Sequence, residues 1–302
     1  MLPASLCAKI MVFRRITRII EVVLNERAVT FGRTEFMETD MEMNKQTSFI
    51  KVTVLQTDIV WEEAKVNRMA VEQLIEKHCD TDLFVLPEMF STGFSMNPME
   101  IAEDEGGETL QWMCRIAALR QCAIAGSLSV REAGNFYNRF YFVCPDGTVY
   151  HYDKRHLFGF GGEDKQYTSG DERVIVSYKG FRFLLQICYD LRFPVWSRCQ
   201  NDYDAVIYVA NWPASRREVW NILLKARALE NQCYVIGVNR VGNDPLCLYD
   251  GGSMIISPYG KILVACTDGK EEVAGALLAR EPLDSFRKRF PVLGDGDDFE
   301  LL

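Results

Sequence analysis

The stretch Phe181-Arg182-Phe183-Leu184-Leu185-Gln186-Ile187-Cys188-Tyr189-Asp190-Leu191-Arg192-Phe193-Pro194 is an apolar run that ends on a cysteine and continues at once in polar residues. This pattern predicts a buried β-strand, and the end of such a strand is where α/β proteins leave room for ligands. The strand fixes Cys188 while the following loop exposes its thiol. Cysteines are also common core residues, so this stretch alone leaves Cys188 either a nucleophile or a structural thiol.

Two further strands are expected to end on charged residues. An apolar run over 82–88 ends at Glu88, and a hairpin of 135–144 and 148–153 delivers Lys154. A carboxylate can take the thiol proton and return it to a leaving amine, while an ammonium can favour the thiolate and stabilise an oxyanion. Thiol-based amide hydrolysis needs these groups, although a single Glu or Lys at a strand end is more often a solvated charge.

The pattern of strands and helices predicts the fold class. Helices are expected near 66–74, over 108–121 and over 216–230, and the last begins at a capping box of Ser215 and Glu218. Because antiparallel hairpins interrupt the βα units, we expect an α/β fold with two mixed sheets packed face to face and helices outside. The apolar helix faces are predicted to be Val66, Met69, Ala70 and Leu74, and Val219, Leu223 and Ala226.

The chain is expected to hold one domain over 49–302, preceded by an extension over 1–48. The extension is rich in arginine, and its apolar run 19–24 is short and contains Glu21, too little for a membrane span or a convincing signal core. We expect it to be disordered or not native, with translation starting at Met41 or Met43. From about 281 the chain is expected to form a tail that packs elsewhere.

Composition excludes several classes of function. The 302 residues are 48% hydrophobic with a net charge of −8, which indicates a globular protein and disfavours nucleic acid as a partner. Ten cysteines occur without a C-x-x-C pair or a matching histidine spacing, so no zinc site is expected and the pattern is typical of a reducing, cytoplasmic compartment. No membrane partner is predicted.

Three segments, centred on Glu88, Lys154 and Cys188, resemble in order the signature motifs of the nitrilase, or carbon-nitrogen hydrolase, family: 84–90, 152–158 and 186–194. The resemblance covers about 49–290 and implies an α-β-β-α sandwich and a homodimer. It implies Glu88 as general base, Lys154 as the cation beside the oxyanion and Cys188 as nucleophile. It further implies the backbone N–H of Tyr189 as second oxyanion donor and Glu163, next to Asp164, as the glutamate that supports the lysine.

Within the family, segments 88–95 and 210–213 are most similar to the omega-amidase branch. That likeness implies hydrolysis of the side-chain amide of 2-oxoglutaramate or 2-oxosuccinamate through a cysteine thioester, with no metal or organic cofactor. The alternatives are a related hydrolase of N-carbamoyl amino acids or aliphatic amides, and a non-catalytic binding protein.

Residues near the three motifs are candidates for binding the small amide substrate. Aromatic side chains give a pocket its shape, and a distal carboxylate needs a cation. The candidate walls are Phe90, Phe94 and Trp212, although Phe94 could equally pack in the core. The candidate cations are Arg192, Arg216 and Arg217, of which the last two could equally be solvated. His156 is expected to order the loop after Lys154.

Overall fold

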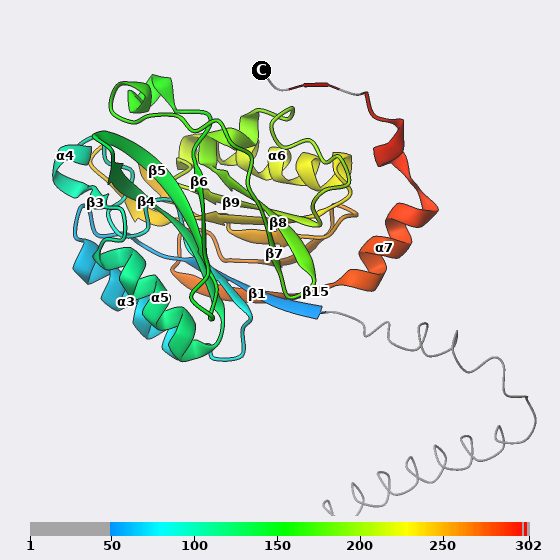
Figure 1. The fold of residues 1–302 in the computed structure, drawn as a ribbon, viewed down its shortest axis with the longest axis horizontal. Coiled ribbons are helices and arrows are strands. Elements are labelled where there is room, and N and C mark those ends of the chain that lie inside the picture. Colours follow the sequence, from blue (N-terminus) through cyan, green and yellow to red (C-terminus); the bar gives the residue numbers. More distant parts are fainter. Residues whose placement is uncertain (1–48, 298, 301–302) are drawn as a thin grey trace, which may run out of the picture. The chain divides into compact units, whose positions relative to one another are not determined.

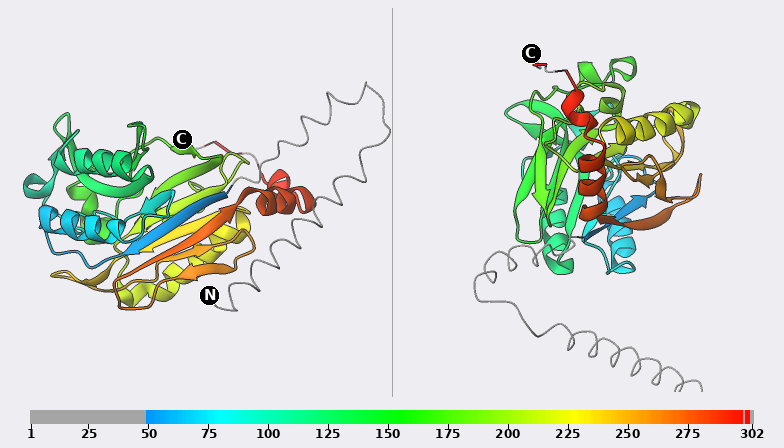
Figure 2. Two further views of the ribbon diagram at one scale, coloured as in Figure 1. Left: turned by 90° about the horizontal axis from the view of Figure 1, so that it is seen from below. Right: turned by 90° about the vertical axis from the view of Figure 1, so that its right-hand side faces the viewer.

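The computed structural model describes residues 49–297, 299 and 300, which form two sheets lying face to face (Figure 1). The first sheet has the strand order β15-β1-β2-β4-β5-β6, with β3 beside β4. Its strands are β1 (Phe49–Gln56), β2 (Leu83–Val85), β3 (Glu103–Asp104), β4 (Ala123–Glu132), β5 (Asn135–Val143), β6 (Val149–Asp153) and β15 (Glu272–Ala279). Figure 2 shows β15 running along β1, its antiparallel neighbour.

The second sheet has the order β14-β13-β10-β9-β8-β7. Its strands are β7 (Ile175–Tyr178), β8 (Phe181–Ile187), β9 (Ala205–Ala210), β10 (Tyr234–Asn239), β13 (Met254–Ile256) and β14 (Ile262–Ala265). Both sheets are mixed, since each has a parallel centre and antiparallel edges. A separate hairpin consists of β11 (Val241–Asn243) and β12 (Leu248–Asp250).

Helices cover the outer faces of both sheets. The first sheet is covered by α3 (Ala64–Glu76) and α5 (Glu108–Arg120), and the second by α6 (Arg217–Glu230). The remaining helices are α4 (Pro98–Ile101) and α7 (Arg280–Arg289), with 3-10 turns η1 (Gly159–Gly161), η2 (Glu163–Lys165), η3 (Cys188–Arg192), η4 (Ala214–Arg216) and η5 (Val292–Asp295).

The alternation of side chains along β8 explains the layers. Phe183, Leu185 and Ile187 face the core between the sheets, whereas Leu184 faces the core under α6. Because successive side chains of a strand point to opposite faces, an apolar run such as this one is buried on both sides. The expected four-layer α-β-β-α sandwich is thereby confirmed.

The predicted helix faces are correct only in part. Leu74, Val219 and Leu223 are partly buried against the cores, but the most buried positions lie about one residue further along each helix. On α3 the buried side chains are Asn67, Arg68, Val71 and Ile75, while on α6 they are Trp220, Leu224, Arg227 and Ala228. A prediction based on apolar residues overlooks the two buried polar residues of α3. Asn67 Nδ2 donates to Ser91 O at 2.7 Å, and Arg68 Nη1 donates to Thr109 Oγ1 at 2.8 Å. A polar residue that finds partners inside the protein can therefore occupy an apolar face.

The capping box at Ser215 is also wrong, because α6 begins one residue later than a cap there requires, at Arg217. The 3-10 turn η4 precedes it, and Arg216 occupies the N-cap position. This turn is fixed by Trp212, whose Nε1 donates to Arg216 O at 2.8 Å.

The tail does not pack elsewhere but returns to the second sheet as α7. Leu283 is fully buried in the central core, and Arg280 Nη1 lies 2.7 Å from Asp204 Oδ2. Residues 1–48, and with them the predicted extension and start codon, lie outside the described residues, so the domain boundary stays a prediction.

Candidate active site

Cys188 occupies a sharp turn that directs it out of the second sheet. It is the first residue of η3, directly after β8, and its φ of +42° is a left-handed value that side chains rarely adopt. The carboxylate of Asp190 holds this turn by accepting the Ile187 N–H at 2.9 Å. Such backbone strain costs about 1–3 kcal/mol and persists only where the surroundings enforce it. The turn leaves the thiol half-buried.

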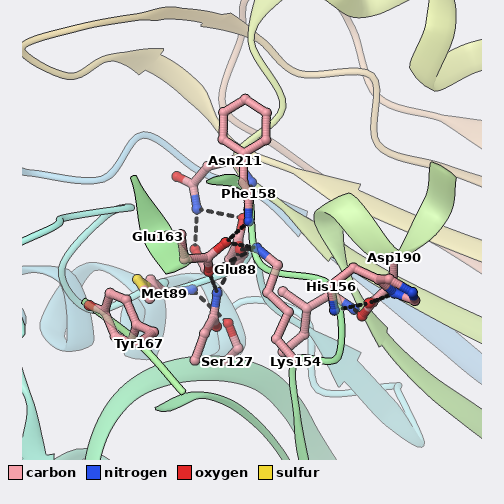
Figure 3. A network of polar contacts seen from close by, with 12 residues as sticks. Glu88, Met89, Ser127, Lys154, His156, Phe158, Glu163, Tyr167, Asp190 and Asn211 are labelled. Atoms are coloured by element: carbon pink, nitrogen blue, oxygen red, sulfur yellow. Dashed lines mark hydrogen bonds and ion pairs between the residues drawn. The ribbon is translucent and has the colours of Figure 1, made fainter. Parts of the chain in front are cut away.

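Lys154 follows β6, and its fully buried ammonium is the centre of an ion cluster. Nζ donates to Oε1 of Glu88 at 2.9 Å and to Oε1 and Oε2 of Glu163 at 3.0 and 2.9 Å. Figure 3 shows both carboxylates converging on this nitrogen. A charge can be buried at acceptable cost only when it is paired and hydrogen-bonded, and these three contacts meet that condition.

Glu88 lies just beyond β2 and is held from both sheets. The backbone N–H of Asn211, at the end of β9, donates to Glu88 Oε2 at 2.8 Å, and Asn211 Nδ2 donates to Glu88 O at 2.6 Å. The next residue, Met89, has a φ of +43° and donates its N–H to Ser127 Oγ at 2.9 Å. The carboxylate therefore has a fixed position between the sheets.

Glu163, in η2, is the glutamate that reaches the lysine. In addition to the two contacts with Lys154, its Oε2 accepts the Phe158 N–H at 2.6 Å, and the side chain is fully buried. The adjacent Asp164 is exposed. Of the two adjacent acidic residues, Glu163 is therefore the one that contacts Lys154.

The charges of the cluster set the protonation states. Burial alone lowers the pKa of Lys154, but the charges of Glu163 and Glu88 outweigh it and raise that pKa, so the ammonium stays protonated. Burial, followed by the charge of Glu88, raises the pKa of the Cys188 thiol well above its ordinary value. Lys154 lowers the pKa of this thiol, as its charge predicts, but burial and Glu88 outweigh that effect, so the thiol loses its proton to a base during attack.

A cavity of about 320 Å³ opens beside this cluster. Cys188, Lys154 and Asn211 contribute to its wall, and so do Tyr189, Trp212 and the two arginines Arg192 and Arg216. The guanidinium of Arg192 lies 5.0 Å from the ring centre of Trp212, and that of Arg216 lies 5.4 Å from the ring centre of Phe158. Stacking on an aromatic ring orients each cation.

Two of the predicted pocket residues are placed differently. Phe90 does not line the cavity but is buried under α5, 5.9 Å from the ring of Trp112, so this prediction is wrong. Phe94 does line the cavity, as one of the candidate walls, with its ring 5.1 Å from Lys154 Nζ. Arg217 is engaged elsewhere, with Asp250 and Asp268.

His156 orders the loop after Lys154, as expected. Its backbone N–H and its Nδ1 lie 3.0 and 2.8 Å from Asp190 Oδ1, and its ring stacks on Phe193 at 3.8 Å. Two residues of the site were not predicted from the sequence. Asp190 lies within the third motif, and Asn138 is a polar residue in a strand that is otherwise mostly apolar. That interruption of the strand pattern was the available signal for Asn138.

Metal ligation and membrane insertion are not supported by the described residues. Between 49 and 300, apart from residue 298, no group of three or more His, Cys, Asp or Glu side chains is arranged to hold a metal ion. Over the same part of the chain, no helix has the length and apolar character needed to span a membrane.

Comparison with known proteins places this geometry in context. Residues 51–288 match the family model described as carbon-nitrogen hydrolase. An omega-amidase from Yersinia enterocolitica is 46% identical over 84% of this chain and 100% of its own length. A 2-oxoglutaramate amidase from Bacillus subtilis is 34% identical over 81% of this chain and 96% of its own.

A solved structure resembles the whole described fold. It is that of a CN-hydrolase superfamily protein from Xanthomonas campestris with an arsenic adduct in its active site. The two chains are 39% identical, the TM-score is 0.82, and the match covers 84% of this chain and 99% of the other.

Proposed function

The chain belongs to the carbon-nitrogen hydrolase family, and on that premise we propose that it is an omega-amidase, which hydrolyses the terminal amide of 2-oxoglutaramate or 2-oxosuccinamate. The observation that carries the proposal is the buried cluster of Glu88, Lys154 and Glu163 beside a half-buried Cys188 at the wall of the cavity. A base, a cation and a nucleophile at one point are the groups that acyl transfer from an amide requires.

Acylation begins with attack of Cys188 Sγ on the amide carbon. Glu88 takes the thiol proton as the carbon–sulfur bond forms, and Lys154 and the N–H of Tyr189 stabilise the oxyanion. When the intermediate collapses, the carbon–nitrogen bond breaks and Glu88 passes its proton to nitrogen, so that ammonia leaves and a neutral thioester remains.

Deacylation uses the same groups in reverse order. Glu88 takes a proton from water while the water oxygen attacks the thioester carbon. The carbon–sulfur bond then breaks and Glu88 returns its proton to the Cys188 sulfur. The carboxylic acid that forms gives the second proton of the water to solvent and leaves as a carboxylate. Glu163 keeps Lys154 charged and in place through both steps, since it accepts two of its hydrogen bonds.

Arg192 and Arg216 account for the choice of a 2-oxo acid amide. Both arginines line the cavity, and among the described residues each guanidinium contacts an aromatic ring and pairs with no carboxylate. Both are therefore available to the substrate's carboxylate and 2-oxo oxygen. An ammonium about 4 Å from one of them would be repelled by about 4 kcal/mol at the polarity of a protein surface. Glutamine, which carries that ammonium, is expected to be a poor substrate.

Ammonia release measured across a panel of compounds tests the proposal. We expect kcat/KM for 2-oxoglutaramate to exceed that for glutamine, N-carbamoyl amino acids, aliphatic amides and nitriles by about 100-fold or more. A clear preference for nitriles or carbamoyl compounds would refute it. Cys188→Ala should abolish turnover without unfolding the protein, and full activity of that variant would refute the mechanism.

The two arginines are tested separately with a matched control. Arg216→Met and Arg192→Met should each raise KM for 2-oxoglutaramate about 10-fold or more, because each removes a charge-assisted contact. Lys225→Met removes an exposed cation from α6 and should leave KM unchanged. Equal KM values in all three variants would show that the carboxylate binds elsewhere.

We also infer a homodimer and a cytoplasmic location. The first follows from the family resemblance and the second from the scattered cysteines. Sedimentation of the full chain at micromolar concentration checks the dimer, and a monomer would contradict it.

A further inference from the structure

Asn138 lies at the centre of the ion cluster, although no chemistry of the proposed mechanism requires it. It stands in the middle of β5, opposite Ser129 of β4, and is fully buried. Its neighbours Phe140 and Phe142 on the same strand belong to the core between the sheets. A polar side chain in such surroundings costs free energy unless its hydrogen bonds are made.

The two N–H groups of the Asn138 amide are both used, and both go to carboxylates. Nδ2 donates to Glu88 Oε1 at 2.8 Å and to Glu163 Oε1 at 3.0 Å. The same two oxygens accept from Lys154 Nζ at 2.9 and 3.0 Å. Asn138 and Lys154 therefore join the same pair of oxygens, one through a neutral amide and the other through a cation.

The number of charges explains why a second donor is needed. Glu88 and Glu163 carry two negative charges, and Lys154 is the cation that pairs with them among the described residues. Two carboxylates that share one buried cation tend to bind a proton between them, because their repulsion is not fully compensated. A proton held there would occupy the oxygen of Glu88 and remove the base.

We propose that Asn138 is a positioning residue that keeps Glu88 free of a proton and fixed toward Cys188, by placing two N–H donors between the carboxylates of Glu88 and Glu163. The inference rests on the proposed role of Glu88 as general base. The amide supplies two N–H donors, which carry partial positive charge, without adding a full charge. It therefore reduces the repulsion between the two carboxylates while Lys154 remains available to the oxyanion.

Other titratable groups face the cluster from neighbouring elements, and each keeps one protonation state between acidic and neutral pH. Burial raises the pKa of Tyr167, whose hydroxyl lies 3.1 Å from Ser129 Oγ, so this phenol remains neutral. The Cys188 thiol is neutral for the same reason, and Lys154 remains charged. Burial raises the pKa of Glu163, so the proton gained on acidification enters the pair of carboxylates that Asn138 joins.

The test compares pH profiles of Asn138 variants using two readouts. The first is kcat/KM for 2-oxoglutaramate, and the second is the rate at which iodoacetamide alkylates Cys188, which needs the base but no substrate. For Asn138→Ala we expect the acidic limb of both profiles to move up by about one pH unit or more, with kcat/KM at neutral pH reduced about 10- to 100-fold and KM little changed. Asn138→Ser retains one donor and should shift the limb by an intermediate amount.

Asn231→Ala is the matched control, because Asn231 is also a fully buried asparagine but caps α6. Its Oδ1 accepts the Cys199 N–H at 2.9 Å, remote from the cluster. Its loss should lower stability and leave both pH limbs in place. If Asn138→Ala does not fold, the proposal is tested by comparing the two pH profiles of Asn138→Ser with those of the wild type.

Each outcome decides for or against the proposal. A shifted limb in the alkylation profile supports it even if 2-oxoglutaramate proves not to be a substrate, so failure of the proposed function is recognised separately. Activity reduced equally at every pH, or limbs that stay within about 0.3 pH unit of wild type, would overturn it.

Discussion

Replacement of Asp190 by asparagine should destabilise the protein severely while changing its shape very little. Four donors converge on this fully buried carboxylate: Oδ2 accepts from Tyr152 OH at 2.8 Å and Ile187 N at 2.9 Å, and Oδ1 accepts from His156 N at 3.0 Å and Nδ1 at 2.8 Å. In Asp190→Asn one oxygen becomes an NH₂ group. In either orientation of the amide, that group meets a main-chain N–H, of Ile187 or His156, that can only donate. It also meets a side-chain partner, Tyr152 OH or His156 Nδ1, that must move its own proton before it can accept.

The magnitude follows from the two hydrogen bonds that are lost. A hydrogen bond to a charged group contributes about 1.5–3 kcal/mol, so two of them suggest a loss of about 3–5 kcal/mol in the free energy of unfolding. Total stabilities are about 5–15 kcal/mol, so this loss is a large part of the whole. Urea unfolding followed by tryptophan fluorescence measures it.

A control variant shows how much the same substitution costs at an exposed aspartate. Asp80→Asn, at an aspartate whose side chain is 95% exposed, should change stability by less than about 0.5 kcal/mol. A loss below about 1 kcal/mol in Asp190→Asn would refute the argument, since it would mean that water or a rearranged turn replaces the carboxylate. Because Asp190 also holds the turn at Cys188, kcat/KM should fall together with stability.

Three further predictions concern the core and the cluster. Burial raises the pKa of Cys122 from 9.0 to about 11, so the unfolded thiol loses its proton first as pH rises, and up to about 2.7 kcal/mol of stability is lost between those values. Urea unfolding in reductant checks this loss, and Cys122→Val should reduce it. Gly237→Ala places a Cβ 2.5 Å from Leu224 Cδ1 and should cost about 1–3 kcal/mol; an unchanged midpoint of thermal unfolding would contradict that clash. Glu163→Gln removes one of the two charges that hold Lys154, so kcat should fall about 100-fold or more while KM changes little, and steady-state kinetics showing the reverse pattern would assign Glu163 to substrate binding.

Strand positions were predictable because the runs are long and apolar. The predicted hairpin of 135–144 and 148–153 matches β5 and β6 to within one residue, and the end of β8 falls at Ile187, directly before Cys188. Periodicity alone placed Glu88, Lys154 and Cys188 at strand ends. The family motifs were needed to predict that these ends meet at one point.

Contacts between distant segments set the limit of prediction. The partners of Asn138 lie 50 and 25 residues away in the chain, and no local spacing encodes such a pair. Phe90 and Phe94 are close in the sequence and both apolar, so the pattern does not show which of them reaches the cavity. The left-handed backbone at Met89 and Gly93 turns the chain here, and the sequence pattern does not reveal that turn. The start of α6 was missed for a related reason, since the contact of Trp212 with Arg216 O overrides the local capping signal.

The excess of negative charge in the cluster has a consequence for the direction of turnover. A neutral amide enters, and under the proposed mechanism the carbon bound to Cys188 leaves as a carboxylate beside Glu88 and Glu163, which share one cation. Like charges at this distance repel each other strongly in a buried site. The carboxylates of Glu88 and Glu163 therefore weaken the binding of the carboxylate product. We expect weak product inhibition and no measurable resynthesis of the amide from ammonia.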